Sequence, residues 1–373
     1  MIRLLHLADV HLGKTFKMLG RRGAEQRRAL QAAFERTVRL AMEHNVHAVL
    51  IAGDLFDSPK PSETLVRFVV QQLRVLDDGG ITTVLIAGNH DVGPDGRVGP
   101  AAQLGEAGAR LRLVGNEPEV YTIPEHDLTI VARSALPGQP LQPLAGWPAY
   151  RASRFVVGVA HGSTFRAGQV EGPHVIHPQN IKDLKLDYLA LGDWHSAFEV
   201  APPPTAAWYA GAPEWLGFDQ PGSGQVLLVT LVDPGKAEVT PLLVGVRRSL
   251  RREFDAAQQD ESALRAILLA DSDPALVYEA VLTGMMPLHR TIHVEALEQE
   301  LAEHFFRLRI TNKARVWLDQ AALEAFPPQT VLGRFVTLMR ERIDVAPDEE
   351  RPLLEEALQV GAAVVSGRPE VLV

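Results

Sequence analysis

The sequence predicts an α/β (α+β) protein whose core is a two-layer β-sandwich flanked by helices, with a smaller α+β domain after it. Three observations carry this prediction. Up to about residue 91, apolar strands alternate with helical patterns, which is typical of parallel strands covered on both faces. Short strands and turns follow as far as about residue 245. Beyond residue 245, charged and apolar residues alternate, and the pattern predicts both helices and strands.

The composition is that of an ordinary globular protein of 373 residues, with 46% hydrophobic and 22% charged residues. The absence of cysteine excludes disulfides, thiolate zinc sites and cysteine nucleophiles, so a metal would have to bind His, Asp, Asn or Glu. The net charge of −9 argues against a surface coated in basic residues, but it does not exclude a local basic patch for nucleic acid. With neither signal-peptide features nor a membrane-length apolar run, a cytoplasmic protein without membrane association is expected.

In the first part of the chain, each predicted strand ends in a polar cluster. The strands are expected at 2–8, 48–52 and 82–87, and the helices between them at 25–44 and 62–76. Asp9 and His11 are two residues apart, a spacing that places both side chains on one face of an extended chain. Because ligands bind outside the carboxyl ends of the strands in open α/β sheets, these clusters are expected to converge.

The middle of the chain is expected to complete the sandwich. Residues 133–153, with several Pro and Gly, are predicted to form a long surface loop. The expected strands lie at 120–123, 128–132, 155–160, 188–191, 225–232 and 238–244.

The chain is predicted to divide into a core domain at 1–245, a small α+β domain at 246–345, and a C-terminal helix and tail at 346–373. No Asp/His/Asn cluster follows a predicted strand of the small domain, so a catalytic role is not expected there. Its strands are expected at 247–254, 275–282 and 306–318, its helices at 261–269, 294–305 and 330–343, and the terminal helix at 349–360.

Strand ends across the core domain supply a set of side chains suited to metal binding. Their number exceeds what one catalytic metal needs and suits two divalent ions, a pair that stabilises the attacking and leaving oxygens in phosphoryl transfer. Glycine beside several of them lets the backbone turn sharply. The candidate residues are Asp9, His11, Asp54, Asn89, His90, His161, Asp193 and His195.

The order and spacing of these motifs resemble the calcineurin-like metallophosphoesterase superfamily. The flanking segments LLHLADVHLG, GDLFD and YAGAPE resemble its SbcD-type DNA repair exonuclease branch. The resemblance covers about residues 1–245 and implies a metallophosphoesterase core, with the later domain as a small capping domain. The motifs concerned are Asp9-x-His11, Gly53-Asp54-x-x-Asp57, Gly88-Asn89-His90-Asp91, His161 and Gly192-x-x-His195.

The resemblance also implies a role for each candidate ligand. Asp9, His11 and His195 would hold the first metal, Asp54 would bridge the two ions, and Asn89, His161 and Asp193 would hold the second. The family usually has His where this chain has Asp193, which leaves open whether Asp193 is a ligand. An aspartate is a competent hard-oxygen ligand and favours Mn²⁺, with Mg²⁺ as the alternative.

Other residues are expected to assist. By the same resemblance, His90 would face the phosphate as a catalytic residue that does not bind metal, since imidazole can exchange protons near neutral pH. Asp57 and Asp91 could orient neighbouring histidines. A basic stretch that includes Lys14, Arg21 and Arg22 could contact nucleic-acid phosphates, although a solvated surface explains it equally well.

Together with the candidate ligands, the resemblance implies a two-metal phosphodiesterase that hydrolyses DNA as a repair exonuclease subunit. The resemblance implies an SbcC-like coiled-coil ATPase partner, and a homodimer is a further assembly to consider. Two alternatives stay open: a phosphodiesterase or phosphatase acting on small nucleotides, and a binding scaffold whose metal site is degraded.

Overall fold

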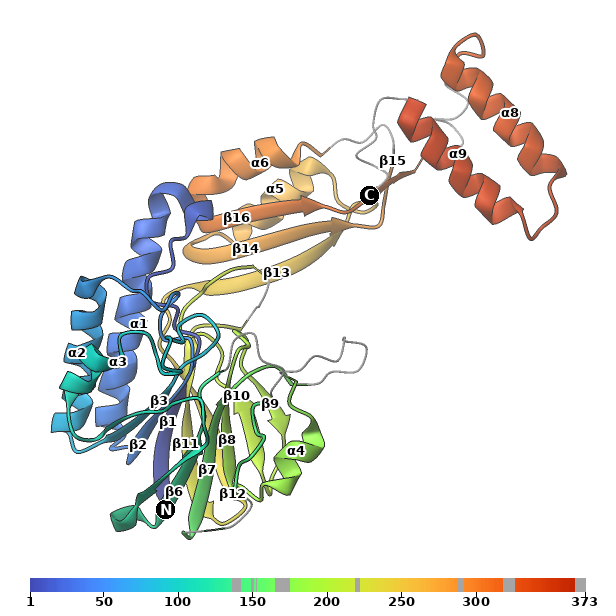
Figure 1. Ribbon diagram of the computed structural model, residues 1–373. Coiled ribbons are helices and arrows are strands. Elements are labelled where there is room, and N and C mark those ends of the chain that lie inside the picture. Colours follow the sequence, from blue (N-terminus) through green and yellow to red (C-terminus); the bar gives the residue numbers. More distant parts are fainter. Residues whose placement is uncertain are drawn as a thin grey trace. The chain divides into compact units, whose positions relative to one another are not determined.

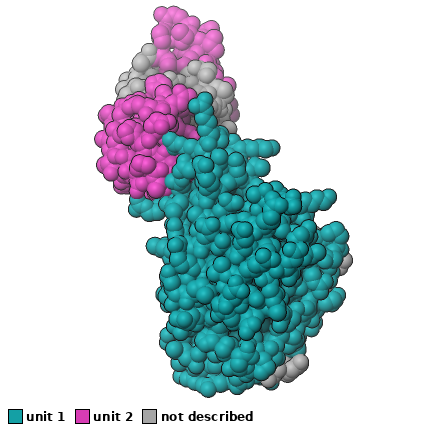
Figure 2. All heavy atoms as spheres, turned by 90° about the vertical axis from the view of Figure 1, so that its left-hand side faces the viewer, with its two compact units in different colours: residues 1–248 teal, residues 249–373 magenta. Residues whose placement is uncertain are grey.

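The structure, a computed structural model, describes residues 1–135, 142–148, 151, 153–164, 175–218, 222–287, 292–317 and 326–365. The chain separates into two compact units, Met1–Arg248 and Ser249–Val373, which are coloured separately in Figure 2. None of the described helices is both long enough and apolar enough to cross a bilayer.

Two six-stranded sheets form the core of the first unit (Figure 1). In the first sheet, four strands run parallel, and β11 pairs antiparallel with β1 at one edge and with β12 beyond it. Its order is β12 (Lys236–Leu243), β11 (Gln225–Asp233), β1 (Ile2–Leu7), β2 (Ala48–Ala52), β3 (Thr82–Ile86) and β4 (Leu111–Leu113).

The second sheet has four parallel strands between two antiparallel edges. Its order is β5 (Glu119–Ile123), β6 (Leu128–Ala132), β7 (Phe155–His161), β8 (Tyr188–Gly192), β10 (Ala206–Tyr209) and β9 (Phe198–Ala201). Side chains from both sheets, such as Leu4, Leu50, Ile130 and Val157, are fully buried together in one apolar cluster. The predicted two-layer sandwich is therefore confirmed.

Helices cover the outer faces of the sandwich. On the first sheet lie α1 (Gly23–Glu43) and α2 (Glu63–Asp78), shown in blue in Figure 1. Ser62 caps α2, because its side chain accepts a hydrogen bond from the N–H of Leu65, and the helix runs two residues beyond the predicted end. On the second sheet, α4 (Pro178–Asp183) buries Ile181 against the outer side chains of β7 and β8.

Three expectations for this unit need correction. Between the predicted strand 2–8 and the predicted helix 25–44, the structure has a 3₁₀ helix, η1 (Lys17–Arg22), which leads directly into α1 two residues earlier than predicted. The short strands β9 and β10 were not predicted as strands, because four residues are too few to show a period. In the predicted surface loop 133–153, Leu144 and Trp147 are buried in the apolar cluster outside the second sheet, since both side chains are large and hydrophobic.

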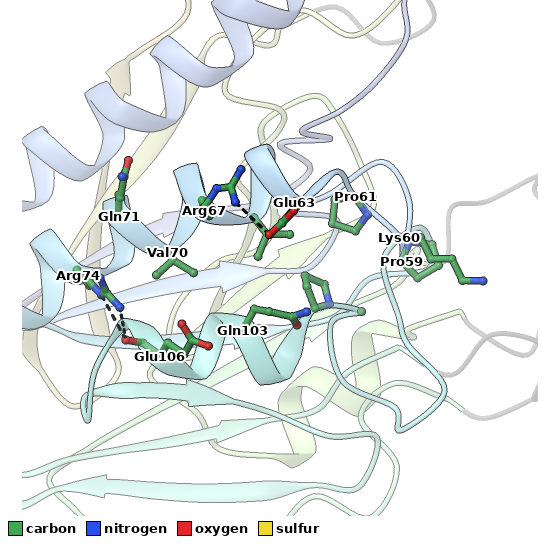
Figure 3. Close-up of a pocket in the computed structure, with 13 residues that line it drawn as sticks. Pro59, Lys60, Pro61, Glu63, Arg67, Val70, Gln71, Arg74, Gln103 and Glu106 are labelled. Atoms are coloured by element: carbon green, nitrogen blue, oxygen red, sulfur yellow. Dashed lines mark hydrogen bonds and ion pairs between the residues drawn. The ribbon is translucent and has the colours of Figure 1, made fainter.

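Short helices complete the first unit: α3 (Ala101–Leu104), η2 (Gly105–Ala107) and η3 (Pro124–His126). A pocket of about 600 Å³ lies between α2 and the α3–η2 segment (Figure 3). Its wall carries an ion pair between Arg67 and Glu63 with an N–O distance of 3.0 Å, and Arg74 donates to the main-chain carbonyl of Glu106. None of the residues that line it is a candidate metal ligand.

The second unit is an α+β structure. Its sheet has the order β13 (Arg248–Asp255), β14 (Asp273–Thr283) and β16 (Phe305–Asn312), and α5 (Glu261–Ala270) and α6 (Val294–Leu301) share an apolar core with it. The predicted helix 294–305 ends earlier, in the 3₁₀ turn η4 (Ala302–His304). The predicted strand 306–318 is two strands, β16 and β17 (Arg315–Trp317), and β17 pairs with β15 (Met285–Pro287).

A helical hairpin of α8 (Val331–Val345) and α9 (Arg351–Val365) ends the described chain. Val336, Leu358 and Ala362 are buried where the two helices pack together. The terminal helix is longer than the predicted 349–360, and the remainder of the predicted tail lies outside the described residues.

Candidate metal centre

The polar residues that follow five strands meet at one end of the sandwich. His161, the last residue of β7, lies with its Nε2 2.9 Å from Oδ1 of Asn89, which follows β3. Its Nδ1 lies 2.9 Å from the carbonyl oxygen of Ala52 at the end of β2. The main-chain N–H of Asp193, after β8, donates to both carboxylate oxygens of Asp9 at 3.1 and 3.2 Å. The strand ends of both sheets therefore converge.

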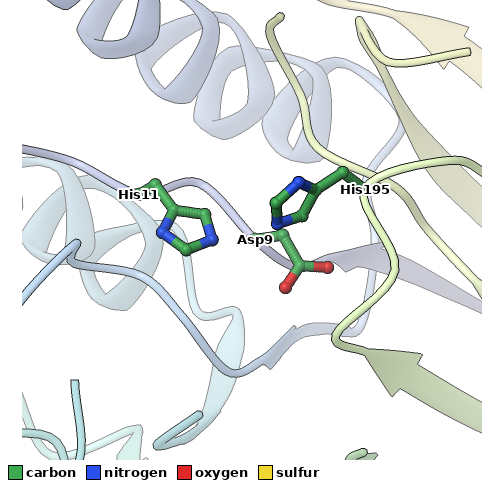
Figure 4. A group of neighbouring side chains, drawn as sticks. All are labelled: Asp9, His11 and His195. Atoms are coloured by element: carbon green, nitrogen blue, oxygen red, sulfur yellow. The ribbon is translucent and has the colours of Figure 1, made fainter. Parts of the chain in front are cut away.

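One group that could hold a metal ion consists of Asp9, His11 and His195 (Figure 4). One ligand atom from each residue lies within 4.8 Å of the others, and the two imidazole centroids are 5.0 Å apart. Asp9 and His11 are almost completely buried. Nε2 of His11 is buried without a hydrogen-bond partner among the described residues. A buried imidazole nitrogen without a hydrogen bond, beside a carboxylate, fits the donor set of a metal site.

Asp57 fixes the orientation of His11. Its Oδ1 lies 3.1 Å from Nδ1 of His11, so the other ring nitrogen, Nε2, is the one left for a metal. Lys14 also lies with its Nζ 3.4 Å from the same oxygen. Burial is the largest single influence on the pKa of Asp57 and would raise it. The hydrogen bond from His11 and the charge of Lys14 together outweigh burial, so the pKa of Asp57 is lowered. Carboxylates in this position are typical partners of metal-binding histidines.

We expect the substitution Asp57→Asn to weaken Mn²⁺ binding about 10- to 100-fold, because the amide is a poorer partner for the imidazole N–H. Titrating Mn²⁺ and following the free ion by electron paramagnetic resonance would measure this. Glu63→Gln is the matched control, since Glu63 is exposed and pairs with Arg67 one helical turn away. Equal affinities for Asp57→Asn and the wild type would show that Asp57 does not support a ligand.

A second group consists of Asp9, Asp54 and His161, all of them buried. Oδ2 of Asp54 lies 3.5 Å from Nε2 of His11 and 3.6 Å from Nε2 of His161. Asp54 thus stands between the histidine of the first group and that of the second. This is the position that the bridging role predicted for Asp54 requires, and the role itself stays a prediction.

Asp193 lies at the edge of the second group. Its Oδ1 is 3.8 Å from Nε2 of His161, and its other carboxylate oxygen accepts a hydrogen bond from the hydroxyl of Ser163. The side chain is 26% exposed, in contrast to the buried Asp9 and Asp54. Ser163 was not a candidate in the sequence, although its spacing of two residues from His161 could have indicated that it shares a face with that histidine.

Negative charge accumulates in this centre. Burial raises the pKa of Asp9 well above its usual range, and the nearby carboxylates of Asp54 and Asp193 raise it further. For His161, burial disfavours the charged ring, but Asp54, Asp9 and Asp193 outweigh it and raise the pKa to about 9. A positive charge between carboxylates that are buried this close together would offset their repulsion. The donor set is therefore compatible with divalent metal ions.

Two further candidates from the third strand differ in their surroundings. His90 is exposed, and its ring centroid lies 4.7 Å from that of His11. Asp91 is buried and accepts hydrogen bonds from the main-chain N–H of Gly88 at 2.8 Å and of Phe56 at 3.1 Å. Burial, and then the charge of Asp54, raises the pKa of Asp91 to about 7. The hydrogen bonds of Asp91 therefore hold the main chain of two loops, whereas Asp57 is the residue that contacts a histidine ring.

The backbone carries strain where the candidate ligands sit. Asp9, His11, Asp54 and Asp193 have φ angles of 53°, 48°, 51° and 110°, a region that residues with a side chain rarely adopt. Each such residue costs on the order of 1–3 kcal/mol, and such strain clusters at functional sites. Gly88 is required here for another reason: a Cβ at this position would overlap the carboxylate of Asp54.

Of the basic residues predicted to contact phosphates, the structure places Lys14 beside the centre, through its contact with Asp57. Arg21 and Arg22 lie in the last turn of η1, where Arg21 is exposed and Arg22 half-buried. The role of all three in substrate binding stays a prediction.

A sandwich with His, Asp and Asn side chains converging at its strand ends defines a candidate centre for divalent metal ions. The sequence pattern of the calcineurin-like phosphoesterase family matches residues 2–197, and the chain belongs to this family. The match contains every candidate metal ligand.

Curated relatives resemble a shorter part of the chain. A DNA double-strand break repair protein Mre11 from Methanopyrus kandleri is 34% identical over 117 residues, which are 31% of this chain and 25% of that protein. Another protein of that name, from Aeropyrum pernix, is 42% identical over 92 residues, or 24% and 21% of the two chains. The SbcD component of the nuclease SbcCD from Escherichia coli K12 is 37% identical over 94 residues, again 24% and 21%. The matched segments thus cover a quarter or less of these relatives.

Proposed function

We propose that this protein is a two-metal phosphodiesterase that hydrolyses DNA, acting as a repair exonuclease subunit. The observation that carries the proposal is the arrangement of two ligand groups that share Asp9, with Asp54 between their histidines. Membership of the phosphoesterase family supports the type of reaction. The names of the relatives, a double-strand break repair protein and a component of a nuclease, support DNA as the substrate.

In this proposal Asp9, His11 and His195 would hold one ion, Asn89, His161 and Asp193 would hold the other, and Asp54 would serve both. When bound, the two ions would supply the positive charge that stabilises the attacking and leaving oxygens of the phosphodiester. Carboxylate, amide and imidazole ligands favour Mn²⁺, with Mg²⁺ as the alternative.

The protein's own side chains would do the remaining work. Asp57 keeps His11 in the orientation that exposes Nε2. The exposed ring of His90 is accessible to a substrate and could protonate the leaving oxygen. The main-chain N–H of His90 donates to Oδ1 of Asp54 at 2.9 Å, so the position of His90 is tied to the centre.

We also propose an SbcC-like coiled-coil ATPase as the partner, because one relative is named as one component of a nuclease complex. The net charge of −9 suits a protein that leaves most contacts with the DNA backbone to another chain. A cytoplasmic location, a homodimer and a capping role for the second unit belong to the same proposal.

The test is an assay of the full chain with Mn²⁺ against three substrates: end-labelled linear DNA, bis-p-nitrophenyl phosphate and p-nitrophenyl phosphate. We expect degradation of the DNA from its ends and turnover of the diester in preference to the monoester, both abolished by EDTA. Preference for the monoester with intact DNA would identify a phosphatase. Fewer than one bound Mn²⁺ per chain after loading would identify a scaffold.

A further inference from the structure

Glu214 is a fully buried carboxylate, outside the candidate ligands, in the YAGAPE segment of the first unit. One of its oxygens accepts hydrogen bonds from the main-chain N–H of Trp215 at 2.8 Å and of Arg247 at 3.3 Å. The other accepts from the N–H of Val246 at 2.8 Å. Burying a carboxylate is costly, and these hydrogen bonds offset the cost by joining two segments that are far apart in the sequence.

Gln26 of α1 completes this network. Its side-chain amide donates to the carbonyl of Trp215 at 2.8 Å and to Glu214 at 3.4 Å. Its carbonyl oxygen accepts from Nε of Arg247 at 3.3 Å. Because Gln26 is itself fully buried, the network fixes three pieces of chain against one another: helix α1, the segment 210–215 and the end of the first unit.

The segment 210–215 in turn contacts both parts of the chain that carry the first ligand group. The N–H of Ala212 donates to the carbonyl oxygen of His195 at 2.9 Å. Gly211, with a φ of 72°, packs so closely that a Cβ would lie 2.9 Å from the same oxygen. On the other side, the indole of Trp215 stacks on Phe16, in the loop after His11, with the ring centroids 6.4 Å apart and the planes at 19°.

We propose that Glu214 is a positioning residue for the ligand group of Asp9, His11 and His195. The inference rests on the proposed metal centre. Without the carboxylate, the N–H groups of Trp215 and Val246 lose their acceptor, and the segment 210–215 is no longer held in place. The main chain of His195 then loses a fixed support, so its imidazole is less well placed for a metal. Displacements of this kind weaken a metal site without removing a ligand.

The test is Glu214→Gln, which keeps the shape of the side chain but places an amide N–H₂ where an acceptor is needed. We expect the affinity for Mn²⁺, measured on the full chain without substrate, to fall about 10-fold or more. Activity should return at high Mn²⁺ concentration, because no ligand is lost.

Asp187→Asn is the matched control. Asp187 is also fully buried and accepts hydrogen bonds from the N–H groups of Val156 at 2.7 Å and Gly235 at 2.6 Å, but it is not among the candidate ligands or their partners. Both variants should lower the melting temperature, and only Glu214→Gln should weaken Mn²⁺ binding. If Glu214→Gln fails to fold, Gly211→Ala is the second variant. Its Cβ would lie too close to the carbonyl oxygen of His195, so it should displace the same support and weaken Mn²⁺ binding.

Mn²⁺ affinity within about twofold of the wild type in the folded variant would overturn the positioning role, since loss of a support around a metal site ordinarily costs at least about 10-fold. That result is distinct from failure of the proposed function, in which the wild-type chain itself would bind no Mn²⁺ or cleave no DNA.

Discussion

Replacing His90 with glutamine should slow hydrolysis of DNA and of bis-p-nitrophenyl phosphate by about 10²- to 10⁴-fold, the contribution typical of a general acid or base. The Mn²⁺ content of the variant should equal that of the wild type. The structure supports a role at the substrate, because His90 is the exposed imidazole of the centre while His11 and His161 are buried. Glutamine retains a polar side chain of moderate size but cannot exchange a proton.

The comparison of rate with metal content separates two roles for this side chain. His90 also lies within ligand distance of His11 and Asp57, so the same geometry would allow it to bind a metal. Loss of one Mn²⁺ together with activity would show that His90 is a ligand, and unchanged activity would show that it has neither role. The control is His304→Gln, which changes an exposed histidine of the second unit.

The sequence predicts the sandwich and the convergence of its strand ends because both depend on local patterns. A helix between two apolar strands favours a parallel pair, and parallel strands bring their carboxyl ends to one edge. The extended conformation predicted for the segment from Asp9 to His11 is nevertheless wrong. The strand β1 ends at Leu7, and both residues lie beyond it with positive φ angles. They converge because the N–H groups of Asp9 and His11 donate to the carbonyls of Gly53 and Asp54.

Contacts between distant segments could not be predicted in the same way. Gln26 and Glu214 are 188 positions apart in the sequence. The pattern of apolar residues around each of them does not indicate that the side chain of Gln26 will donate to the carboxylate of Glu214. The hydrogen bond between Ser163 and Asp193 is a contact of the same kind, although the spacing of Ser163 from His161 could have indicated that Ser163 lies near the site. The role predicted for Asp91 in orienting a histidine stays a prediction, and the two hydrogen bonds that its oxygens accept from main-chain N–H groups were not foreseen from its motif. Tertiary packing decides such contacts, and it is visible only in the folded chain.

Asp54→Asn should have the largest effect on the metal centre. The carboxylate of Asp54 lies between His11 and His161, so in the proposed centre its loss would remove a negative charge and a ligand oxygen beside both histidines. We expect the variant to retain at most one Mn²⁺. The rate of hydrolysis should fall by at least about 10²- to 10³-fold, which is the usual effect of removing one electrostatic contact to a transition state. Asp78→Asn, an exposed change at the end of α2, is the control.

The metal-free protein provides an independent measurement of the same substitution. Burial lowers the pKa of His161, and Asp54 is the strongest of the charges that raise it to about 9. In Asp54→Asn, that pKa should therefore fall, and a nuclear magnetic resonance titration of the His161 ring would detect the change. The sign for stability follows: a histidine whose pKa is raised in the folded state stabilises it below the unfolded pKa of about 6.5, and the contribution is lost as pH rises through 9. As the pH rises from 6.5 to 9, the free energy of unfolding of metal-free Asp54→Asn should therefore fall by less than that of the metal-free wild type. Equal decreases would show that Asp54 does not act on His161.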